Sequence, residues 1–263
     1  MIRKFPIALA TAILALASPA AHAALATQTV AYAHQQTQMQ GLLVLDDAAP
    51  TPQPLVLVVH EWWGLNDYAR NRARQLAQMG YAAFAVDMYG KGVVAKTRDE
   101  AAKLAGPLRS DRKLMRARIK AALDAVSKNP RVDAKRIAVI GYCFGGTVAL
   151  ELARSGADIA GVVSFHGGLD TPTPQDARSI KAKILVCTGA DDRSVPMTQV
   201  QGFIEEMRPA KVNYQINIYS GAVHAFTNPA SGDDPSTNVA YNETADKRSW
   251  EAMKNFFDEI FKR

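Results

Sequence analysis

One cysteine of this chain lies inside a cluster of glycines, in the segment GYCFGG (141–146). The segment follows the apolar run 136–141 and fits the pattern Gly-x-nucleophile-x-Gly, with Cys143 at the nucleophile position. Small neighbours are needed because the central residue of such a turn has a strained backbone, and the N-terminus of the following helix favours a thiolate. The pattern predicts nucleophilic catalysis by Cys143. The alternative is an ordinary strand–glycine–helix connection with an incidental cysteine.

A nucleophile of this kind needs a base, and hydrolases with this turn place nucleophile, acid and histidine in that order along the chain. Two histidines, His166 and His224, follow Cys143. The segment TGADDRSVP offers Asp191 or Asp192 as the acid, and only His224 lies beyond it in the sequence. We therefore expect Cys143, one of the two aspartates and His224 to act together. Taken singly, Asp192 could cap a turn and His224 could be a surface histidine.

An oxyanion formed in such a reaction requires preorganised backbone amide donors. One is expected from Phe144, the residue after the nucleophile. The other is expected from the loop HEWWGLND (60–67), in which the amide of Trp62 is the natural candidate. Glu61 of this loop could be a helix-entry or surface carboxylate. We instead expect it to contact the thiol of Cys143 and to influence its protonation.

The predicted site consists of side chains and amides, without a metal or another cofactor. The sequence shows no metal-binding cluster, and no lysine follows the glycines as a phosphate-binding loop would require. Aromatic residues near the site are candidates for lining an apolar substrate pocket, although each would also suit the core. They are Trp62, Trp63, Tyr89, Phe144 and Phe226.

Apolar runs typical of buried strands alternate with segments typical of helices over most of the chain. This alternation predicts an α/β fold, with a mostly parallel central sheet, helices on both faces and functional residues at the carboxyl ends of the strands. TQTVAYA and TQMQGLLVL predict a peripheral hairpin, and Gly106-Pro107 is expected to separate one helix from the next. The predicted strands are 55–60, 81–87, 136–141, 159–167, 182–190 and 212–221; the predicted helices are 68–80, 98–105, 111–128, 146–156, 197–208 and 245–261.

The first 23 residues have the features of a secretory signal peptide. Arg3 and Lys4 precede an apolar stretch over 7–17, and residues 21–23 fit an Ala-x-Ala cleavage site. An uncleaved membrane anchor is the alternative, but the apolar stretch is short and rich in alanine. We expect export to the periplasm or the medium, a single domain over 24–263, and no membrane span after signal removal.

The composition argues against nucleic acid as a partner. The net charge is +6, removal of Arg3 and Lys4 leaves +4, and the basic residues are spread along the chain. Of the two cysteines, Cys187 lies in an apolar run and Cys143 at a turn, so we expect a buried free thiol at Cys187 rather than a disulfide. The sequence lacks the Cys-x-x-Cys motif that is typical of thiol-redox proteins, which argues against the alternative of a thiol-redox role. We expect a monomer that acts on a small molecule.

Taken together, these motifs resemble the dienelactone hydrolase family, whose members have the α/β-hydrolase fold. The resemblance runs from about Leu55 to the end of the chain and rests on HEWWGLND, YAAFAVDMYG, IGYCFGG, DDRSVP and GAVHAF, in that order. It implies Cys143 as the nucleophile and His224 as the base. It also selects Asp192 as the acid, because the family aspartate stands three residues before the valine of Asp-x-x-Val-Pro.

The resemblance also carries implications for the loop before the first predicted helix. It implies that Glu61 contacts the resting Cys143 and helps to generate the thiolate when substrate binds. It further implies that the amides of Trp62 and Phe144 form the oxyanion hole. The role of Asp191 is left open.

One position departs from the family pattern. The best-known members carry an arginine four residues after the histidine, where it binds the substrate carboxylate, and this chain has Asn228 there. A second substrate-binding arginine has Arg98 and Arg109 as candidate equivalents. We predict an exported ester or lactone hydrolase of the carboxymethylenebutenolidase type, with Asn228 contacting the substrate. The alternatives are a carboxylesterase or thioesterase with the same site, or a non-catalytic binding protein on the same scaffold.

Overall fold

The central strands consist of apolar residues because both of their faces are buried. The computed structural model of the chain describes residues 1–2 and 24–262. In its third strand, Leu55 and Leu57 point into one core cluster, whereas Val56 and Val58 point into another. Successive side chains of a strand point to opposite faces, so one continuous apolar run supplies two cores.

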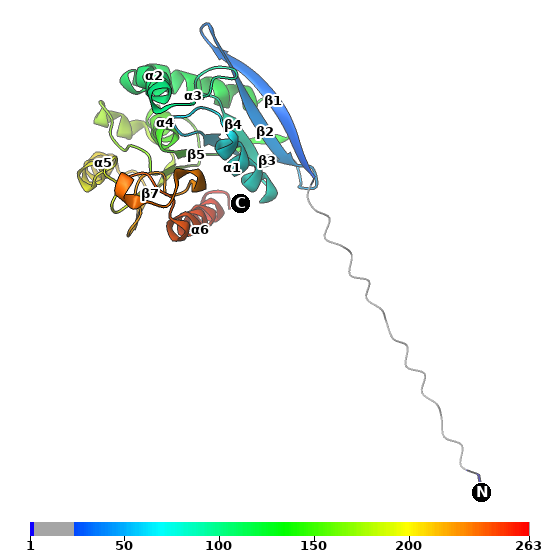
Figure 1. Cartoon of the computed structure of the whole chain (residues 1–263). Helices are drawn as coiled ribbons and strands as arrows, with labels where there is room; N and C mark the ends of the chain where they lie inside the picture. The colour runs from blue at the N-terminus through cyan, green and yellow to red at the C-terminus, as the bar shows by residue number, and fades with distance from the viewer. Residues whose placement is uncertain (3–23, 263) are drawn as a thin grey trace.

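The described residues form one eight-stranded sheet in the order β1-β2-β4-β3-β5-β6-β7-β8 (Figure 1). β1 and β2 form an antiparallel hairpin at one edge, β2 is antiparallel to β4, and the other neighbouring pairs are parallel. The mostly parallel sheet and the peripheral hairpin are therefore confirmed. The strands are β1 (Leu25–His34), β2 (Thr37–Asp46), β3 (Gln53–Val59), β4 (Ala82–Val86), β5 (Val132–Tyr142), β6 (Gly161–Phe165), β7 (Lys183–Gly189) and β8 (Tyr214–Tyr219).

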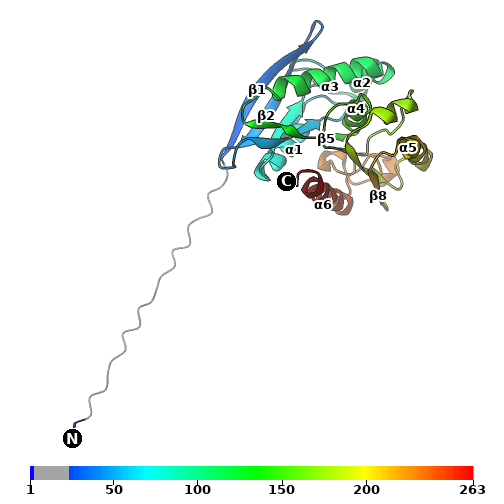
Figure 2. The same ribbon diagram turned by 180° about the vertical axis from the view of Figure 1, so that it is seen from behind.

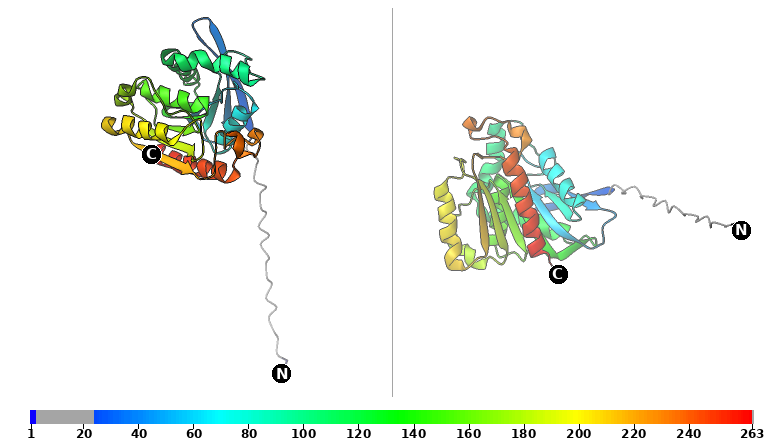
Figure 3. Two further views of the ribbon diagram at one scale, coloured as in Figure 1. Left: turned by 60° about the vertical axis from the view of Figure 1, so that its left-hand side comes forward. Right: turned by 90° about the horizontal axis from the view of Figure 1, so that it is seen from below.

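Helices cover both faces of this sheet, as predicted. α3, α4 and α5 contribute buried residues to the cluster of Leu55, and α1 and α6 contribute to the cluster of Val56. Figure 2 shows α3 and α4 on one side of the sheet, and the right-hand view of Figure 3 shows α6, in red, across the other. The helices are α1 (Asp67–Gln78), α2 (Arg98–Ser110), α3 (Arg112–Val126), α4 (Phe144–Arg154), α5 (Met197–Ala210) and α6 (Glu243–Ile260).

One helix boundary differs from the prediction. Helix α2 does not end before Gly106-Pro107 but continues through both residues to Ser110. Proline costs the helix one amide donor. The side chain of Leu108, one residue further on, is buried in the core, and this burial favours the last helical turn. Asp111 then ends α2 and caps α3 by accepting a hydrogen bond of 2.9 Å from the amide of Leu114.

The loops that follow neighbouring parallel strands meet at one edge of the sheet. β3, β5, β6, β7 and β8 are successive neighbours and run in the same direction. Their carboxyl ends therefore bring together residues far apart in the sequence. The predicted site residues follow four of these strands, namely β3, β5, β7 and β8.

Candidate active site

Cys143 stands at the tight turn between β5 and α4, with backbone angles φ 53° and ψ −116°. Positive φ is unfavourable for a residue with a side chain, so the surrounding structure must hold it there. A Cβ on Gly141 would lie 1.9 Å from the carbonyl oxygen of Gly145, and one on Gly145 would lie 2.3 Å from that of Val59. The two glycines are thus required by close backbone contacts around the strained cysteine.

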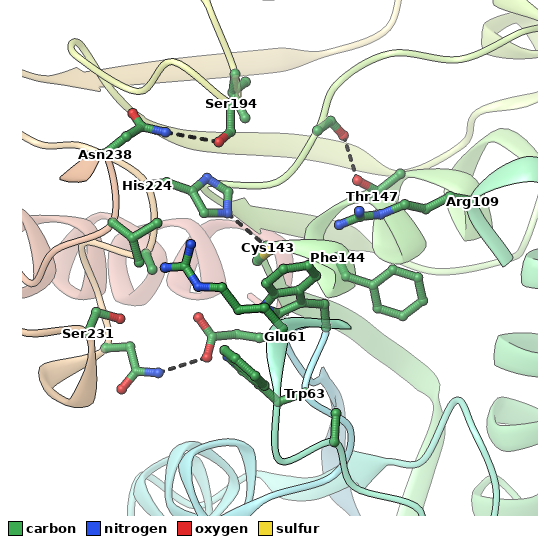
Figure 4. Close-up of a pocket in the computed structure, with 18 of the residues that line it drawn as sticks. Glu61, Trp63, Arg109, Cys143, Phe144, Thr147, Ser194, His224, Ser231 and Asn238 are labelled. Atoms are coloured by element: carbon green, nitrogen blue, oxygen red, sulfur yellow. Dashed lines mark hydrogen bonds between the residues drawn. The ribbon is translucent and has the colours of Figure 1, made fainter. Parts of the chain in front are cut away.

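The structure brings Cys143, His224 and Asp192 together, and Figure 4 shows the first two of these residues. Nε2 of His224 lies 3.1 Å from Sγ of Cys143, and Nδ1 lies 2.9 Å from Oδ2 of Asp192. The other carboxylate oxygen of Asp192 accepts hydrogen bonds from the amides of Ser194 and Val195. Each group can therefore orient the next, in the geometry of a nucleophile, a base and an orienting acid.

The neighbouring aspartate has a different environment. The side chain of Asp191 is exposed, whereas Asp192 retains 3% of its surface. The amide of Asp191 donates to the carbonyl of Ala222, which joins the loop after β7 to the loop after β8. The choice between the two aspartates therefore agrees with their burial and with the hydrogen bond to His224.

The electrostatics of the trio favour a charged imidazole on His224. Burial lowers the pKa of His224, but the charge of Cys143 and the hydrogen bond to Asp192 outweigh burial, so the pKa lies well above its ordinary value of 6.5. The sulfur of Cys143 thus faces a cation at the N-terminus of α4. This is the kind of environment in which cysteine acts as a nucleophile.

The loop after β3 is held from behind by polar contacts to its backbone. Nε2 of His60 accepts the amide of Met88 at 3.2 Å, so Nδ1 carries the proton and donates to the carbonyl of Glu61. The hydroxyl of Tyr89 donates to the carbonyl of Trp62 at 3.0 Å. Burial lowers the pKa of His60 to about 4, which keeps this ring neutral at physiological pH.

Two backbone amides near Cys143 are available for an oxyanion. Phe144 is the first residue of α4, and amides in the first turn of a helix have no intrahelical acceptor. Within the described residues, the amide of Trp62 has no hydrogen-bond acceptor either. These are the two donors expected from the sequence, and both residues line the pocket that contains Cys143.

The partner of Glu61 is not the one expected. Among the described residues, the carboxylate of Glu61 has no hydrogen bond to Cys143 and instead accepts one of 2.7 Å from Nδ2 of Asn228. The sulfur of Cys143 instead lies within hydrogen-bond distance of His224, which belongs to the loop after β8. Burial raises the pKa of Glu61 to about 6, although the hydrogen bond from Asn228 opposes this rise. Glu61 and Cys143 line the same pocket without a hydrogen bond between them among the described residues, so an influence of Glu61 on the thiol stays a prediction.

The pocket above Cys143 has a volume of about 1050 Å³, enough for a drug-sized molecule. Trp62, Trp63 and Phe144 line it, and so does Asn228. Figure 4 shows Trp63 and Glu61 on one side of Cys143 and His224 on the other.

Two of the predicted lining residues lie behind the pocket wall instead. Phe226 has no exposed surface and packs edge-on against His166 within the core cluster of Val56. Tyr89 is 7% exposed, and its hydroxyl donates a hydrogen bond to the carbonyl of Trp62. Both expectations are corrected: these two aromatic residues support the loops of the site rather than line its pocket.

One side of the pocket is cationic. Arg98 and Arg109 of α2 and Arg112 of α3 line it. Arg112 forms an ion pair of 3.1 Å with Asp170, and the guanidinium of Arg109 lies 6.0 Å from the ring centre of Trp62. Within the residues that the structure describes, neither Arg98 nor Arg109 has a salt-bridge partner. Both candidate arginines therefore lie at the pocket.

Sequence reasoning assigned no role to His166, which follows β6. Its ring is fully buried, and its Nδ1 lies 3.1 Å from the backbone nitrogen of Cys143. The available signal was its position: it is a histidine at the carboxyl end of a strand that is adjacent to the strand of the nucleophile.

Comparison with known proteins also indicates a dienelactone hydrolase. A model of the dienelactone hydrolase family matches residues 39–261. The solved structure of m3DLH is 42% identical, with a TM-score of 0.87 and coverage of 90% of this chain and 99% of its own. That of the dienelactone hydrolase-like promiscuous phosphotriesterase P91, from metagenomic libraries, is 39% identical, with a TM-score of 0.86 and coverages of 91% and 100%.

A curated relative supports the match at the level of sequence. A protein of Aquifex aeolicus (strain VF5), provisionally named carboxymethylenebutenolidase, is 30% identical over 80% of this chain and 89% of its own. The mostly parallel sheet is thus that of the α/β-hydrolase fold. Because the family model covers most of the residues and the solved relatives span nearly their whole length, this chain belongs to the dienelactone hydrolase family and is a hydrolase of lactone or ester bonds.

Proposed function

We propose that the protein hydrolyses a small ester or lactone through a covalent acyl-enzyme on Cys143. The observation that carries the proposal is the pair of contacts made by His224, 3.1 Å to Sγ of Cys143 and 2.9 Å to Asp192. Such a chain of contacts allows one imidazole to exchange protons with the nucleophile while the carboxylate fixes its orientation.

The reaction proceeds in two halves. The thiolate of Cys143 attacks the acyl carbon, and the amides of Trp62 and Phe144 stabilise the oxyanion. The carbon–oxygen bond then breaks, and the imidazolium of His224 gives its proton to the leaving alkoxide, which in a lactone stays tethered to the acyl group. In the second half, His224 takes a proton from water, the resulting hydroxide attacks the thioester, and the carboxylic acid leaves as the thiolate is restored.

The pocket supports a substrate with an apolar body and an anionic or strongly polar group. Trp62 and Trp63 offer flat apolar surface, whereas Arg98 and Arg109 offer positive charge. At the position of the family's arginine, the pocket has the uncharged side chain of Asn228. This amide already donates a hydrogen bond to Glu61. The anionic group therefore binds on the α2 side rather than beside Asn228.

The test is a comparison of purified wild type, Cys143→Ala and Cys143→Ser on a panel of lactones and short acyl esters. A phosphotriester belongs in the panel because the similar P91 is described as a phosphotriesterase. We expect Cys143→Ala to abolish turnover and Cys187→Ala, which changes a fully buried thiol, to retain it. Full activity of Cys143→Ala would overturn the proposal.

The alternative hypothesis, that the protein binds a ligand without catalysis, predicts a different result. Under the proposal, a thiol-directed reagent labels Cys143 near neutral pH and spares Cys187, because burial raises the pKa of Cys187 to about 12. Equal resistance of both thiols, together with an inactive panel, would favour the binding protein.

We also propose that the protein is exported. The support is the signal-like sequence of the first 23 residues, most of which lie outside the described residues. Of the helices described, none is long and apolar enough to cross a membrane. Cell fractionation with N-terminal sequencing tests the proposal: a mature chain beginning at Ala24 supports it, and an uncleaved chain in the cytosol contradicts it.

A further inference from the structure

A buried histidine joins the turn of the nucleophile to the loop of the base. His166 follows β6 and has no exposed surface. Its Nδ1 lies 3.1 Å from the backbone nitrogen of Cys143, and its Nε2 lies 2.7 Å from Oγ1 of Thr227. Thr227 stands three residues after His224. One imidazole thus spans the two loops that carry the nucleophile and the base.

The two contacts of His166 fix its tautomer. The backbone nitrogen of Cys143 carries a hydrogen and can only donate, so Nδ1 of His166 must accept and must be unprotonated. The proton of the neutral ring then lies on Nε2 and is donated to the hydroxyl of Thr227. The amide of Cys143 has a second acceptor, the carbonyl of Phe165 at 3.0 Å, so it is held from two sides.

The hydroxyl of Thr227 is held in turn. It lies 2.7 Å from the hydroxyl of Tyr68, which receives a hydrogen bond of 3.3 Å from Nε of Arg72. Arg72 also donates to the carbonyl of Thr227 at 2.7 Å and forms an ion pair of 2.5 Å with Asp246. The loop after β8 is therefore held against α1 and α6 at Thr227, the residue that accepts the hydrogen bond from Nε2 of His166.

The contacts of His166 lie where the backbone of the site is strained. Cys143 has a φ of 53°, and His166 itself has a φ of 41°. Strained backbone persists where surrounding contacts over-determine it, and such strain is found where side-chain placement matters for function. Here the contacts also connect the loop of Cys143 to the loop of His224, and these two loops follow different strands.

We propose that His166 is a positioning residue, which holds the strained turn of Cys143 through Nδ1 and locks it to the loop of His224 through Nε2 and Thr227. This inference rests on the proposed cysteine mechanism. His166 does not itself line the pocket, so it acts on the reaction through the geometry of Cys143 and His224, which do.

The charges around His166 agree with the neutral ring. His224, whose ring centre is 5.3 Å away, and Arg72 are the charged groups that face it, while Tyr142 and Phe226 pack against it as uncharged rings. Burial, followed by the charges of His224 and Arg72, holds the pKa of His166 well below its ordinary value. Protonation of Nδ1 would also remove one of the two acceptors of the Cys143 amide.

Substitution of the ring tests the first contact. His166→Phe keeps a planar ring but removes the acceptor, and we expect kcat to fall roughly 10- to 100-fold with KM little changed, because small displacements of reacting groups cost this much. His166→Asn should restore most of kcat, since its Oδ1 can occupy the place of Nδ1 and asparagine tolerates positive φ. A role confined to stability would lower the melting temperature of His166→Phe and leave its kcat at the wild-type value.

Substitution of the hydroxyl tests the second contact. Thr227→Val leaves Nε2 without an acceptor, and we expect a loss in kcat of roughly tenfold, as for one buried hydrogen bond. Thr188→Val is the matched control: its buried hydroxyl has no hydrogen-bond partner among the described residues, so kcat should not change. The double variant His166→Phe/Thr227→Val should be no slower than His166→Phe alone, because both changes break one connection.

The tautomer can be read without any substrate. Nitrogen NMR of histidine-labelled protein should show, for His166, an unprotonated Nδ1 and a protonated Nε2. Thr227→Val should shift the Nε2 resonance, because it removes the acceptor of that proton, and should leave Nδ1 unprotonated, whereas Thr188→Val should change neither nitrogen. A protonated Nδ1 in the wild type would overturn the proposal, as would unchanged kcat in His166→Phe. Failure of the cysteine mechanism is distinct: Cys143→Ala would then be active while the tautomer stayed as described.

Discussion

The side-chain amide of Asn228 donates a hydrogen bond of 2.7 Å to Oε2 of Glu61, and both residues are almost wholly buried beside the pocket. The best-known members of the family have a cation at this position. Here a neutral amide satisfies the carboxylate without balancing its charge. The consequence is a carboxyl group whose burial raises its pKa to about 6.

Replacement of Glu61 by glutamine is expected to stabilise the protein at neutral and alkaline pH. The pKa of Glu61 is about 6 in the folded protein and 4.5 ordinarily, so the folded state binds this proton more tightly than the unfolded state. Ionisation of Glu61 therefore costs stability as pH rises through 6, by about 2 kcal/mol at most, and this cost is absent below pH 4.5, where both states are protonated. Glu61→Gln removes it.

Denaturant unfolding over a pH series checks this expectation. The stability difference between Glu61→Gln and wild type should grow between pH 4.5 and 6 and reach a plateau above this range. Glu205→Gln, an exposed carboxylate on α5, is the control and should show little difference throughout. A difference for Glu61→Gln that does not vary with pH would contradict the assigned pKa.

The two adjacent aspartates should respond unequally to the same change. Asp192→Asn removes the charge that orients His224, and we expect kcat to fall at least about a hundredfold, as is usual for the acid of such a trio. Asp191→Asn changes an exposed side chain and should leave kcat within about twofold of wild type. Steady-state kinetics on one ester suffice, and equal effects of the two variants would refute the assignment of Asp192.

The hydroxyl of Tyr89 is expected to matter for catalysis although it lies behind the pocket. Tyr89→Phe removes the 3.0 Å hydrogen bond to the carbonyl of Trp62 and so loosens the loop whose amide we propose as an oxyanion donor. We expect kcat to fall roughly three- to tenfold, the worth of one hydrogen bond, with KM nearly constant. Tyr214→Phe at the start of β8 is the control. A change confined to KM would instead return Tyr89 to a substrate-binding role.

Sequence patterns predict the features of this protein that depend on local chemistry and on chain order. The apolar run of β7 and the glycines around Cys143 have direct local causes, so the sheet and the turn were predictable. Asp192 and His224 were predictable because each follows a strand and because the order of the three residues is restricted.

Side-chain partners were less predictable because they depend on how distant loops meet. Asn228 reaches Glu61 from 167 positions further along the chain, and a pattern in either segment does not reveal that contact. Phe226 lies two residues after His224, yet it turns into the core while His224 faces Cys143. Pro107 marks a helix end by its own chemistry, but burial of Leu108 outweighs this preference and extends α2.

Two glycine-to-alanine changes should have opposite effects on stability. Gly145→Ala would place a Cβ 2.3 Å from the carbonyl oxygen of Val59, which rigid backbone cannot relieve, so we expect a loss of at least about 3 kcal/mol. Gly202→Ala lies in α5 with no atom within 4 Å of the new Cβ, and we expect a gain of about 1 kcal/mol. Thermal and denaturant unfolding measure both, and a stable Gly145→Ala would contradict the tight turn.

The most direct measurement of the central claim is mass spectrometry of the enzyme quenched during turnover of an activated aryl ester. Its good leaving group makes deacylation the slow step, so a covalent intermediate accumulates. We predict one acyl group per chain, located on the peptide that contains Cys143, and its absence from Cys143→Ala. Rapid release of the alcohol while Cys143 stays unmodified, or an acyl group on another residue, would contradict the account.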